Sequence, residues 1–258
     1  MKMNQDYHNI RDKIVAFISS KVSEAGTSGA VIGLSGGIDS TLTAYLAVEA
    51  LGRENVLGLL LPEKGITSDL DIDDAKEIAD ILGIDHKLIE ISEILASYSK
   101  VLPDFDEKNL TANGNLKARI RMCILYYHAN LMHRMVAGTG NKTELLLGYF
   151  TKYGDGGVDI EPIGGLYKTQ VRGLARYMGV PAHIIDKTPT AGLWPGQTDE
   201  GELGVSYEVA DLILSKLVDE KQNVADLRKI FPASHVDRLV ALSRINQHKR
   251  MPPQAFEI

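Results

Sequence analysis

A six-residue segment has the composition of an anion-binding loop. Residues 35–40 read Ser-Gly-Gly-Ile-Asp-Ser, between an apolar run and a stretch with helical spacing. Glycines allow a tight turn whose backbone N–H groups point at one anion, and the positive end of a following helix strengthens the attraction. The hydroxyls of Ser35 and Ser40 add donors, and the carboxylate of Asp39 suits Mg²⁺. The segment predicts a phosphate-binding loop; the alternative is an ordinary glycine-rich turn.

A second glycine-rich block, Gly138–Asp159, follows another expected strand. The carboxyl ends of parallel strands meet at one edge of a sheet, so this block should lie beside the first loop. We expect Glu144 to complete the Mg²⁺ shell, although a lone Glu in a helix is ordinarily solvated. Lys152, Asp155 and Asp159 stand among glycines that let a backbone approach a ligand closely. The alternative for these three residues is a solvent-exposed turn.

The elements that position these blocks follow an alternating pattern. Runs rich in Val, Ile and Leu alternate with amphipathic segments, which predicts an α/β fold: a Rossmann-like parallel sheet with helices on both faces. The tail, residues 205–250, predicts a C-terminal helical part packed on it. Strands are expected near 30–34, 56–61, 86–91 and 135–139. Helices are expected near 7–22, 40–51, 68–82, 115–134 and 167–178.

Composition narrows the classes of function. The 258 residues suit one domain over 1–258, with 44% hydrophobic and 24% charged residues. The net charge of −6 argues against broad binding to nucleic acid. We see no apolar signal segment at residues 1–8 and no bilayer-spanning run, so we expect a cytoplasmic protein with no membrane partner. The single cysteine, Cys123, excludes an intramolecular disulfide, and we expect it to be buried.

Two other segments allow alternative interpretations. Asp69, Asp71, Asp73 and Asp74 at the start of an expected helix suggest a metal cluster, but acidic residues there simply complement the helix dipole, and we prefer that interpretation. Glycine and proline are dense over residues 188–197, which indicates a functional loop or a linker. We choose residues 191–202 as a closing lid, together with the loop after residue 62. The single tryptophan in this segment is a lid residue or an ordinary packing residue.

The first loop resembles the SGGxDS loop of the ATP pyrophosphatases, whose fold is described as adenine nucleotide alpha hydrolase-like. Six segments together resemble the ammonia-dependent NAD synthetases, in order and over nearly the whole chain, and residues 192–200 resemble the archaeal branch. The six segments are 35–40, 117–122, 138–159, 165–170, 189–191 and 248–250.

This resemblance implies an amide-forming ligase that uses ATP, deamido-NAD, ammonia and Mg²⁺, in the last step of NAD biosynthesis. The nicotinate carboxylate attacks the α-phosphorus of ATP, pyrophosphate leaves, and ammonia displaces AMP from the acyl-adenylate. Positioned cations and donors would stabilise the charge that develops on pyrophosphate. The chain has no visible glutaminase domain, so free ammonia or another polypeptide would supply the nitrogen.

The resemblance also implies roles for individual residues. The catalytic candidates are Asp39, Lys168 and Asp155, of which Asp155 would position ammonia or take a proton from ammonium. The metal ligands would be Asp39 and Glu144. The ATP-binding residues would be Gly33, Leu34, Ser35, Gly36, Gly37, Ile38, Asp39, Ser40, Thr139, Lys168 and Thr190. The deamido-NAD-binding residues would be Arg119, Lys152, Asp159, His248 and Lys249. Without the family, Lys168 reads as a surface cation and residues 248–250 as a basic helix end.

The resemblance further implies a homodimer with deamido-NAD bound across the interface. The expected helix 115–134 is a candidate dimer surface, or a buried helix. Rival functions are a tRNA thiolase, the synthetase half of a glutamine amidotransferase, and a non-catalytic nucleotide sensor. A thiolase would need reactive cysteines or a basic surface, and a sensor would not need a pair of metal ligands.

Overall fold

The computed structural model describes residues 6–256 and contains one parallel sheet. Its four strands are β1 (Ala30–Gly33), β2 (Val56–Leu60), β3 (Asp85–Leu88) and β4 (Met135–Val136), in the order β3-β2-β1-β4. The parallel sheet and its four strands confirm the prediction. Each strand ends earlier than expected, and the segments that follow β1, β2 and β4 turn into loops that line the cavity described below.

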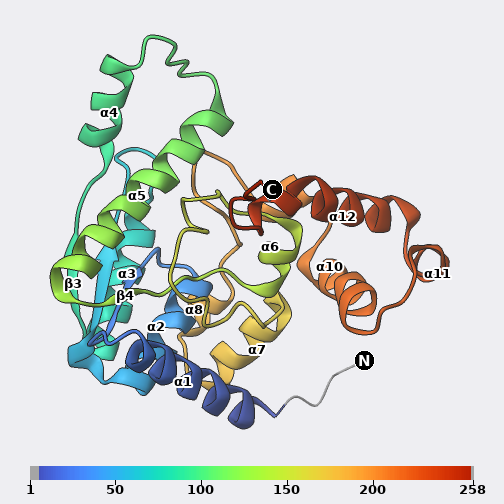
Figure 1. Ribbon diagram of the computed structural model, residues 1–258, viewed down its shortest axis with the longest axis horizontal. Helices are drawn as coiled ribbons and strands as arrows, with labels where there is room; N and C mark the ends of the chain where they lie inside the picture. The colour runs from blue at the N-terminus through green and yellow to red at the C-terminus, as the bar shows by residue number, and fades with distance from the viewer. Residues whose placement is uncertain (1–5, 257–258) are drawn as a thin grey trace.

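Helices connect the strands and continue beyond them (Figure 1). The α-helices are α1 (Tyr7–Glu24), α2 (Ile38–Leu51), α3 (Asp69–Leu82), α4 (Ser92–Val101), α5 (Leu110–Met132), α6 (Lys142–Leu147), α7 (Lys168–Tyr177), α8 (Ala182–Ile185), α9 (Asp199–Leu203), α10 (Tyr207–Leu214), α11 (Val224–Ile230) and α12 (Ala233–Ile245). The 3-10 segments are η1 (Arg53–Asn55) and η3 (Asn246–Lys249), and a π-helical turn, η2, spans Ser215–Asp219.

Helices cover both faces of the sheet. Side chains alternate along a strand, so Ile32 packs with α1, α2, α3 and α7 while its neighbour Val31 packs with α5. Both residues are fully buried. The Rossmann-like arrangement expected from the sequence is therefore confirmed.

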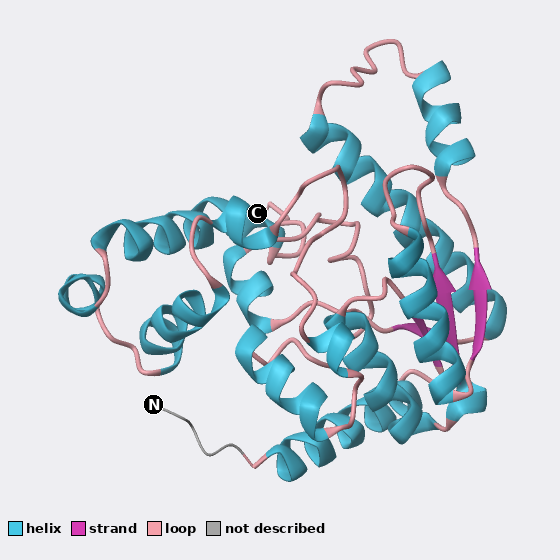
Figure 2. Ribbon diagram, turned by 180° about the vertical axis from the view of Figure 1, so that it is seen from behind, coloured by secondary structure: helices cyan, strands magenta, loops and turns pink. Residues whose placement is uncertain are grey.

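A separate apolar cluster holds the C-terminal helices together. Tyr207 is fully buried in it, along with residues of α10, α11 and α12. Figures 1 and 2 show these helices on the side of the molecule away from the sheet. Leu147, within the glycine-rich block, and Tyr167, directly before α7, belong to the same cluster and join the helices to the rest of the chain. The helical tail was predicted correctly.

The structure corrects several expectations. Helix α5 begins at Leu110, earlier than expected, because the Asn109 side chain caps it by accepting from Ala112 N–H. Helix α4 was not expected. Cys123 is exposed, not buried, because it lines a shallow groove between α4 and α5. The first five residues, part of the stretch searched for a signal segment, lie outside the described residues. Within the described residues, no helix is long and apolar enough to cross a membrane.

Candidate active site

The glycine-rich loop leaves the end of β1 and enters α2. Gly36 has φ +72°, and a Cβ on it would lie 2.3 Å from the carbonyl oxygen of Asp71, so only glycine fits. Ser40 Oγ lies 3.0 Å from Ser35 Oγ, accepts from the Ser35 N–H and donates to the Gly37 carbonyl. These bonds close the loop on the first turn of α2. The loop has the compact shape of an anion-binding turn at a helix N-terminus.

Asp39, Glu144 and Lys168 meet at the floor of a cavity. Lys168 Nζ lies 2.5 Å from Asp39 Oδ2 and 3.5 Å from Glu144 Oε1, and its side chain is 2% exposed. Lys168 is therefore not a surface cation. Burial lowers the pKa of Lys168, but the two carboxylates outweigh burial and raise it. Burial raises the pKa of Glu144 to about 8; Lys168 opposes this increase, and Asp39 adds to it.

Further acidic and phenolic groups surround this floor. Asp199, at the start of α9, accepts from Tyr207 O–H at 3.0 Å and from Tyr149 O–H at 3.2 Å. Tyr149 also donates to Glu202. Burial raises the pKa of Asp199, and Lys168 counteracts it. Asp199 and Glu202 were not among the expected site residues, although an acidic run directly after the glycine- and proline-rich loop was a usable signal.

The floor belongs to one cavity of about 530 Å³, a volume typical of small-ligand sites. The cavity collects most of the residues expected to bind ATP and metal. Those lining it are Gly33, Leu34, Ser35, Gly37, Ile38, Asp39, Ser40, Thr139, Glu144, Lys168 and Thr190, and two other expected site residues, Asp155 and Lys249, also line it. Gly36 does not line it. Lys152, Asp159 and His248 do not line it either, and Arg119 lines the groove between α4 and α5.

Asp155 and Lys249 lie on one wall of the cavity. Asp155 Oδ1 accepts from Thr151 N–H at 2.9 Å, and the side chain is accessible through the cavity. The surrounding protein atoms raise the pKa of Asp155, and backbone hydrogen bonds and Lys249 counteract the rise. Lys249 Nζ donates to the carbonyls of Gly148 and Phe150. This wall offers a carboxylate with raised proton affinity beside an ammonium group.

The residues expected to bind the second nucleotide are spread over a neighbouring surface. Lys152 Nζ donates to the carbonyls of His248 and Met251, and Arg119 donates to the carbonyl of Lys152. These contacts join α5, the glycine-rich block and the C-terminal segment. They place Arg119, Lys152 and His248, three of the residues expected to bind deamido-NAD, beside one another on the surface outside the cavity.

Asp159 has partners within the protein. Its Oδ1 accepts from Tyr126 O–H at 3.0 Å, and its Oδ2 accepts from Val136 N–H at 2.7 Å. Burial, together with the hydrogen bond and charge of Asp159, raises the pKa of the Tyr126 hydroxyl. The carboxylate thus ties the glycine-rich block to β4 and α5.

The loop of residues 188–197 is anchored to α5. Lys117 Nζ lies 2.8 Å from Glu63 Oε2 and donates to the carbonyl of Leu193 at 2.9 Å. A Cβ on Gly114 would lie 3.2 Å from atoms of Leu193 and Trp194, so the loop approaches the helix closely. Lys117 and Glu63 are both buried. Lys117 therefore links the two segments that we expected to close over the site, one by an ion pair and the other by a hydrogen bond.

Thr190 organises the same loop internally. Its Oγ1 donates to the Gln197 carbonyl at 2.8 Å and accepts from Gly192 N–H at 3.1 Å. Gln197 Oε1 in turn accepts from Leu193 N–H. The loop is a hydrogen-bonded turn that borders the cavity, which favours a functional loop over a linker.

The parallel sheet, the glycine-rich loop at its carboxyl edge and the cavity above it define an α/β nucleotide-binding protein. The model of the family described as NAD synthase matches residues 10–253. The chain belongs to this family.

The comparisons extend over nearly the whole chain. The NH3-dependent NAD+ synthetase of Methanococcoides burtonii is 52% identical over 250 residues, which cover 96% of this chain and 95% of that relative. A structure of NMN synthetase from Francisella tularensis has a TM-score of 0.88 at 36% identity, over 99% of this chain and 100% of that chain. A structure of NH3-dependent NAD synthetase from Campylobacter jejuni has a TM-score of 0.83 at 35% identity, over 98% and 100%.

Proposed function

We propose that the chain forms NAD from deamido-NAD, ATP and ammonia. The observation that carries this proposal is the convergence of Asp39, Glu144 and Lys168 beneath the Ser35–Ser40 loop, in a chain of the NAD synthase family. The nicotinate carboxylate attacks the α-phosphorus of ATP and pyrophosphate leaves. Ammonia then attacks the acyl carbon, AMP leaves, and the amide of NAD remains.

The phosphate end of the cavity has the donors that this chemistry needs. The loop amides and the N-terminus of α2 would bind the phosphates, and Lys168 would stabilise the negative charge that develops on the leaving pyrophosphate. Asp39 and Glu144 are oxygen donors of the kind that Mg²⁺ prefers, and the carboxylates around Lys168 outnumber its single positive charge. Mg²⁺ bound there would neutralise phosphate charge.

The wall formed by Asp155 is our choice for the ammonia site. Ammonium must lose a proton before its nitrogen attacks, and a carboxylate with a raised pKa is a suitable acceptor. The anchored loop of residues 188–197 would exclude water from the adenylate. Arg119, Lys152, Asp159, His248 and Lys249 would bind deamido-NAD, with Arg119, Lys152 and Lys249 supplying positive charge.

A homodimer is part of this proposal. Tyr127 and Leu131 on α5 are 66% and 64% exposed, beside the apolar groove between α4 and α5. Covering such side chains is a common role of a second copy. Analytical ultracentrifugation should show a dimer for the native protein and a monomer for Tyr127→Glu. A native monomer would contradict the dimer.

The Francisella structure supports a second candidate function, namely amidation of the mononucleotide instead of the dinucleotide. The two functions share ATP chemistry and differ in the acid substrate. The higher identity to NH3-dependent NAD+ synthetases, 52% against 36%, favours the dinucleotide.

The deciding assay mixes purified protein with ATP, Mg²⁺, ammonium and either deamido-NAD or nicotinate mononucleotide. Chromatography then follows NAD, NMN, AMP and pyrophosphate, with each component omitted in turn and with glutamine replacing ammonium. We expect NAD and AMP in equal amounts, dependent on ammonium and not supported by glutamine. NMN formation at a higher kcat/KM would select the second candidate. ATP cleavage without either amide would contradict both candidates.

A further inference from the structure

Lys187 joins three parts of the fold immediately behind the phosphate loop. It follows α8 and precedes the loop of residues 188–197. Its Nζ donates to the carbonyl of Gly36 at 3.0 Å, to Asp71 Oδ1 at 2.8 Å and to Asp74 Oδ2. An ammonium group has three N–H donors, so the side chain is fully engaged. None of the functional roles assigned above includes this residue.

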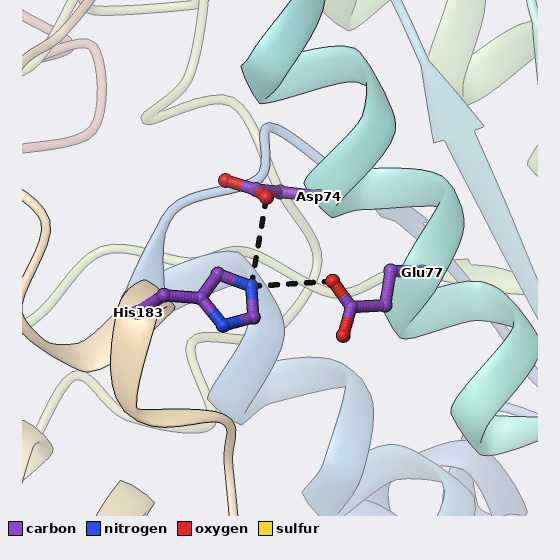
Figure 3. A group of neighbouring side chains, drawn as sticks. All are labelled: Asp74, Glu77 and His183. Carbon is purple, nitrogen blue, oxygen red and sulfur yellow. Dashed lines mark ion pairs between the residues drawn. The ribbon is translucent and has the colours of Figure 1, made fainter.

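A second cluster holds α8 in place beside α3 (Figure 3). His183 Nε2 lies 3.2 Å from Glu77 Oε2 and 3.6 Å from Asp74 Oδ1. Asp74 is 4% exposed and is shared between His183 and Lys187. Since the ammonium of Lys187 already neutralises Asp74, we interpret the cluster as an anchor for the segment that carries Lys187.

The hydrogen bond from Lys187 to the Gly36 carbonyl also fixes the direction of the Gly37 N–H. In a trans peptide the C=O of one residue and the N–H of the next point in opposite directions. Lys187 binds the Gly36 carbonyl, so the Gly37 N–H points away from Lys187 and toward Ser35 Oγ, to which it donates at 3.3 Å. The structure has no cis peptide bonds among its described residues.

The Gly36–Gly37 peptide lies between two glycines. Glycine adopts both positive and negative φ, so these residues offer little resistance to a rotation of the peptide plane. A rotated peptide would turn the Gly36 carbonyl toward the cavity and present a negative dipole to the phosphates. Gly37 lines the cavity, so the orientation of this one peptide decides whether the loop attracts or repels an anion there.

We propose that Lys187 is a positioning residue for nucleotide binding: its bond to the Gly36 carbonyl, braced by Asp71 and Asp74, keeps the Gly37 N–H directed into the phosphate site. The proposal rests on the proposed function only in taking the loop as the phosphate site. A rival role is direct contact of Lys187 with a phosphate, since the side chain also borders the cavity.

Asp74→Asn separates these two roles. If Lys187 positions the peptide, loss of its anchoring carboxylate loosens the side chain and weakens phosphate binding. If Lys187 contacts the phosphate directly, removal of a nearby negative charge leaves binding unchanged or strengthens it. Asp74 bonds to Lys187 behind the loop and does not line the cavity, so its own effect reaches the ligand through Lys187.

The experiment measures binding of inorganic pyrophosphate and of ATP, each with Mg²⁺, by calorimetry. The variants are Lys187→Met, Lys187→Arg and Asp74→Asn, and the matched control is Lys76→Met on α3, which removes a partly exposed ion pair with Asp73. We expect Kd for pyrophosphate to rise about tenfold in Lys187→Met and about threefold in Asp74→Asn. Lys187→Arg should recover most of the loss, and Lys76→Met should match the native protein.

Deamido-NAD binding and thermal unfolding of each variant show whether the effect is local. Binding of deamido-NAD should stay native, and a crystal structure of Lys187→Met should show the Gly36–Gly37 peptide rotated. Native pyrophosphate affinity in Lys187→Met, or tighter binding in Asp74→Asn, would overturn the proposal. Should Lys187→Met fail to fold, Asp74→Asn and Lys187→Arg decide the question. These binding measurements do not depend on NAD formation. A failure of the positioning proposal can therefore be distinguished from a failure of the proposed reaction.

Discussion

Lys168 and Asp39 are 129 residues apart in the chain, yet their side chains form a buried ion pair at the centre of the cavity floor. The negative charges of Glu144 and Asp199 also raise the pKa of this ammonium group. Buried charges of one sign repel each other strongly unless a partner compensates them. The single positive charge of Lys168 therefore has a structural role as well as its proposed catalytic one.

Lys168→Met should destabilise the protein by about 3–5 kcal/mol near pH 8, because it leaves buried carboxylates unpaired. The pKa of Glu144 is already raised to about 8, and an acid with a raised pKa stabilises the folded state only while protonated. The loss of stability should therefore be smaller at pH 6 than at pH 8. Urea unfolding at both pH values measures the free energy of unfolding. Lys229→Met, which removes an exposed ion pair with Asp226, should have no effect. An equal loss at both pH values would contradict the interpretation.

Asp39→Asn and Glu144→Gln should each weaken divalent cation binding at the cavity floor. Mn²⁺ is a suitable probe because it prefers the same oxygen ligands as Mg²⁺ and is detected by electron paramagnetic resonance. We expect at least about a tenfold rise in Kd in either variant, as loss of a charged ligand predicts. Glu208→Gln, outside the cavity on α10, is the matched control. Native Mn²⁺ affinity in both site variants would exclude these carboxylates as metal ligands.

Trp194 is the only tryptophan of the chain, so its fluorescence reports on the loop of residues 188–197. Lys117→Met removes the bond to the Leu193 carbonyl and should free the loop from α5. The emission should move to longer wavelength, and acrylamide should quench it more strongly. Lys117→Met combined with Glu63→Gln controls for the unpaired buried carboxylate. The free energy of unfolding of this double variant should return toward the native value, whereas its Trp194 emission should remain shifted. Native fluorescence in both variants would mean that Lys117 does not anchor the loop.

Glu161 should give the protein a pH-dependent stability. Burial raises its pKa to about 8, the Gly140 N–H opposes this, and the charge of Asp155 adds to it. Because the folded state binds the proton more tightly, the contribution of Glu161 is fully present near pH 4 and is lost as the pH rises to about 8. Glu161→Gln should match the native protein at pH 5 and exceed its free energy of unfolding by about 1–3 kcal/mol at pH 8.

The control for this prediction is Glu107→Gln, a change at an exposed residue between α4 and α5. Its free energy of unfolding should follow the native protein at every pH. A Glu161→Gln profile parallel to the native one would show that the carboxyl of Glu161 does not titrate between pH 5 and 8.

The two glycine-rich blocks and the sheet edge that joins them were predictable, because each block directly follows an apolar run. Lys187 was not, because its proximity to the loop depends on how α8 packs, and for Asp199 the sequence offered only the acidic run after residue 197 as a signal. Asp71 and Asp74 illustrate the same limit: their position at a helix start suggested a metal cluster or, as we preferred, the helix dipole, while the pairing with Lys187 is contained in no local pattern. Cys123 was misassigned because both sides of its helix are apolar and only the fold decides which side is covered.

The position of β1 in the middle of the sheet also sets the order in which the site can form during synthesis. On the ribosome the phosphate loop emerges early, whereas β4, the second neighbour of β1, and the ammonium partner of Asp39 emerge much later. Contacts between residues so far apart close slowly, after the local helices. A partly synthesised chain therefore has the phosphate loop but not yet Lys168, the ammonium partner of Asp39. Nucleotide binding should become detectable only when the complete fold has formed.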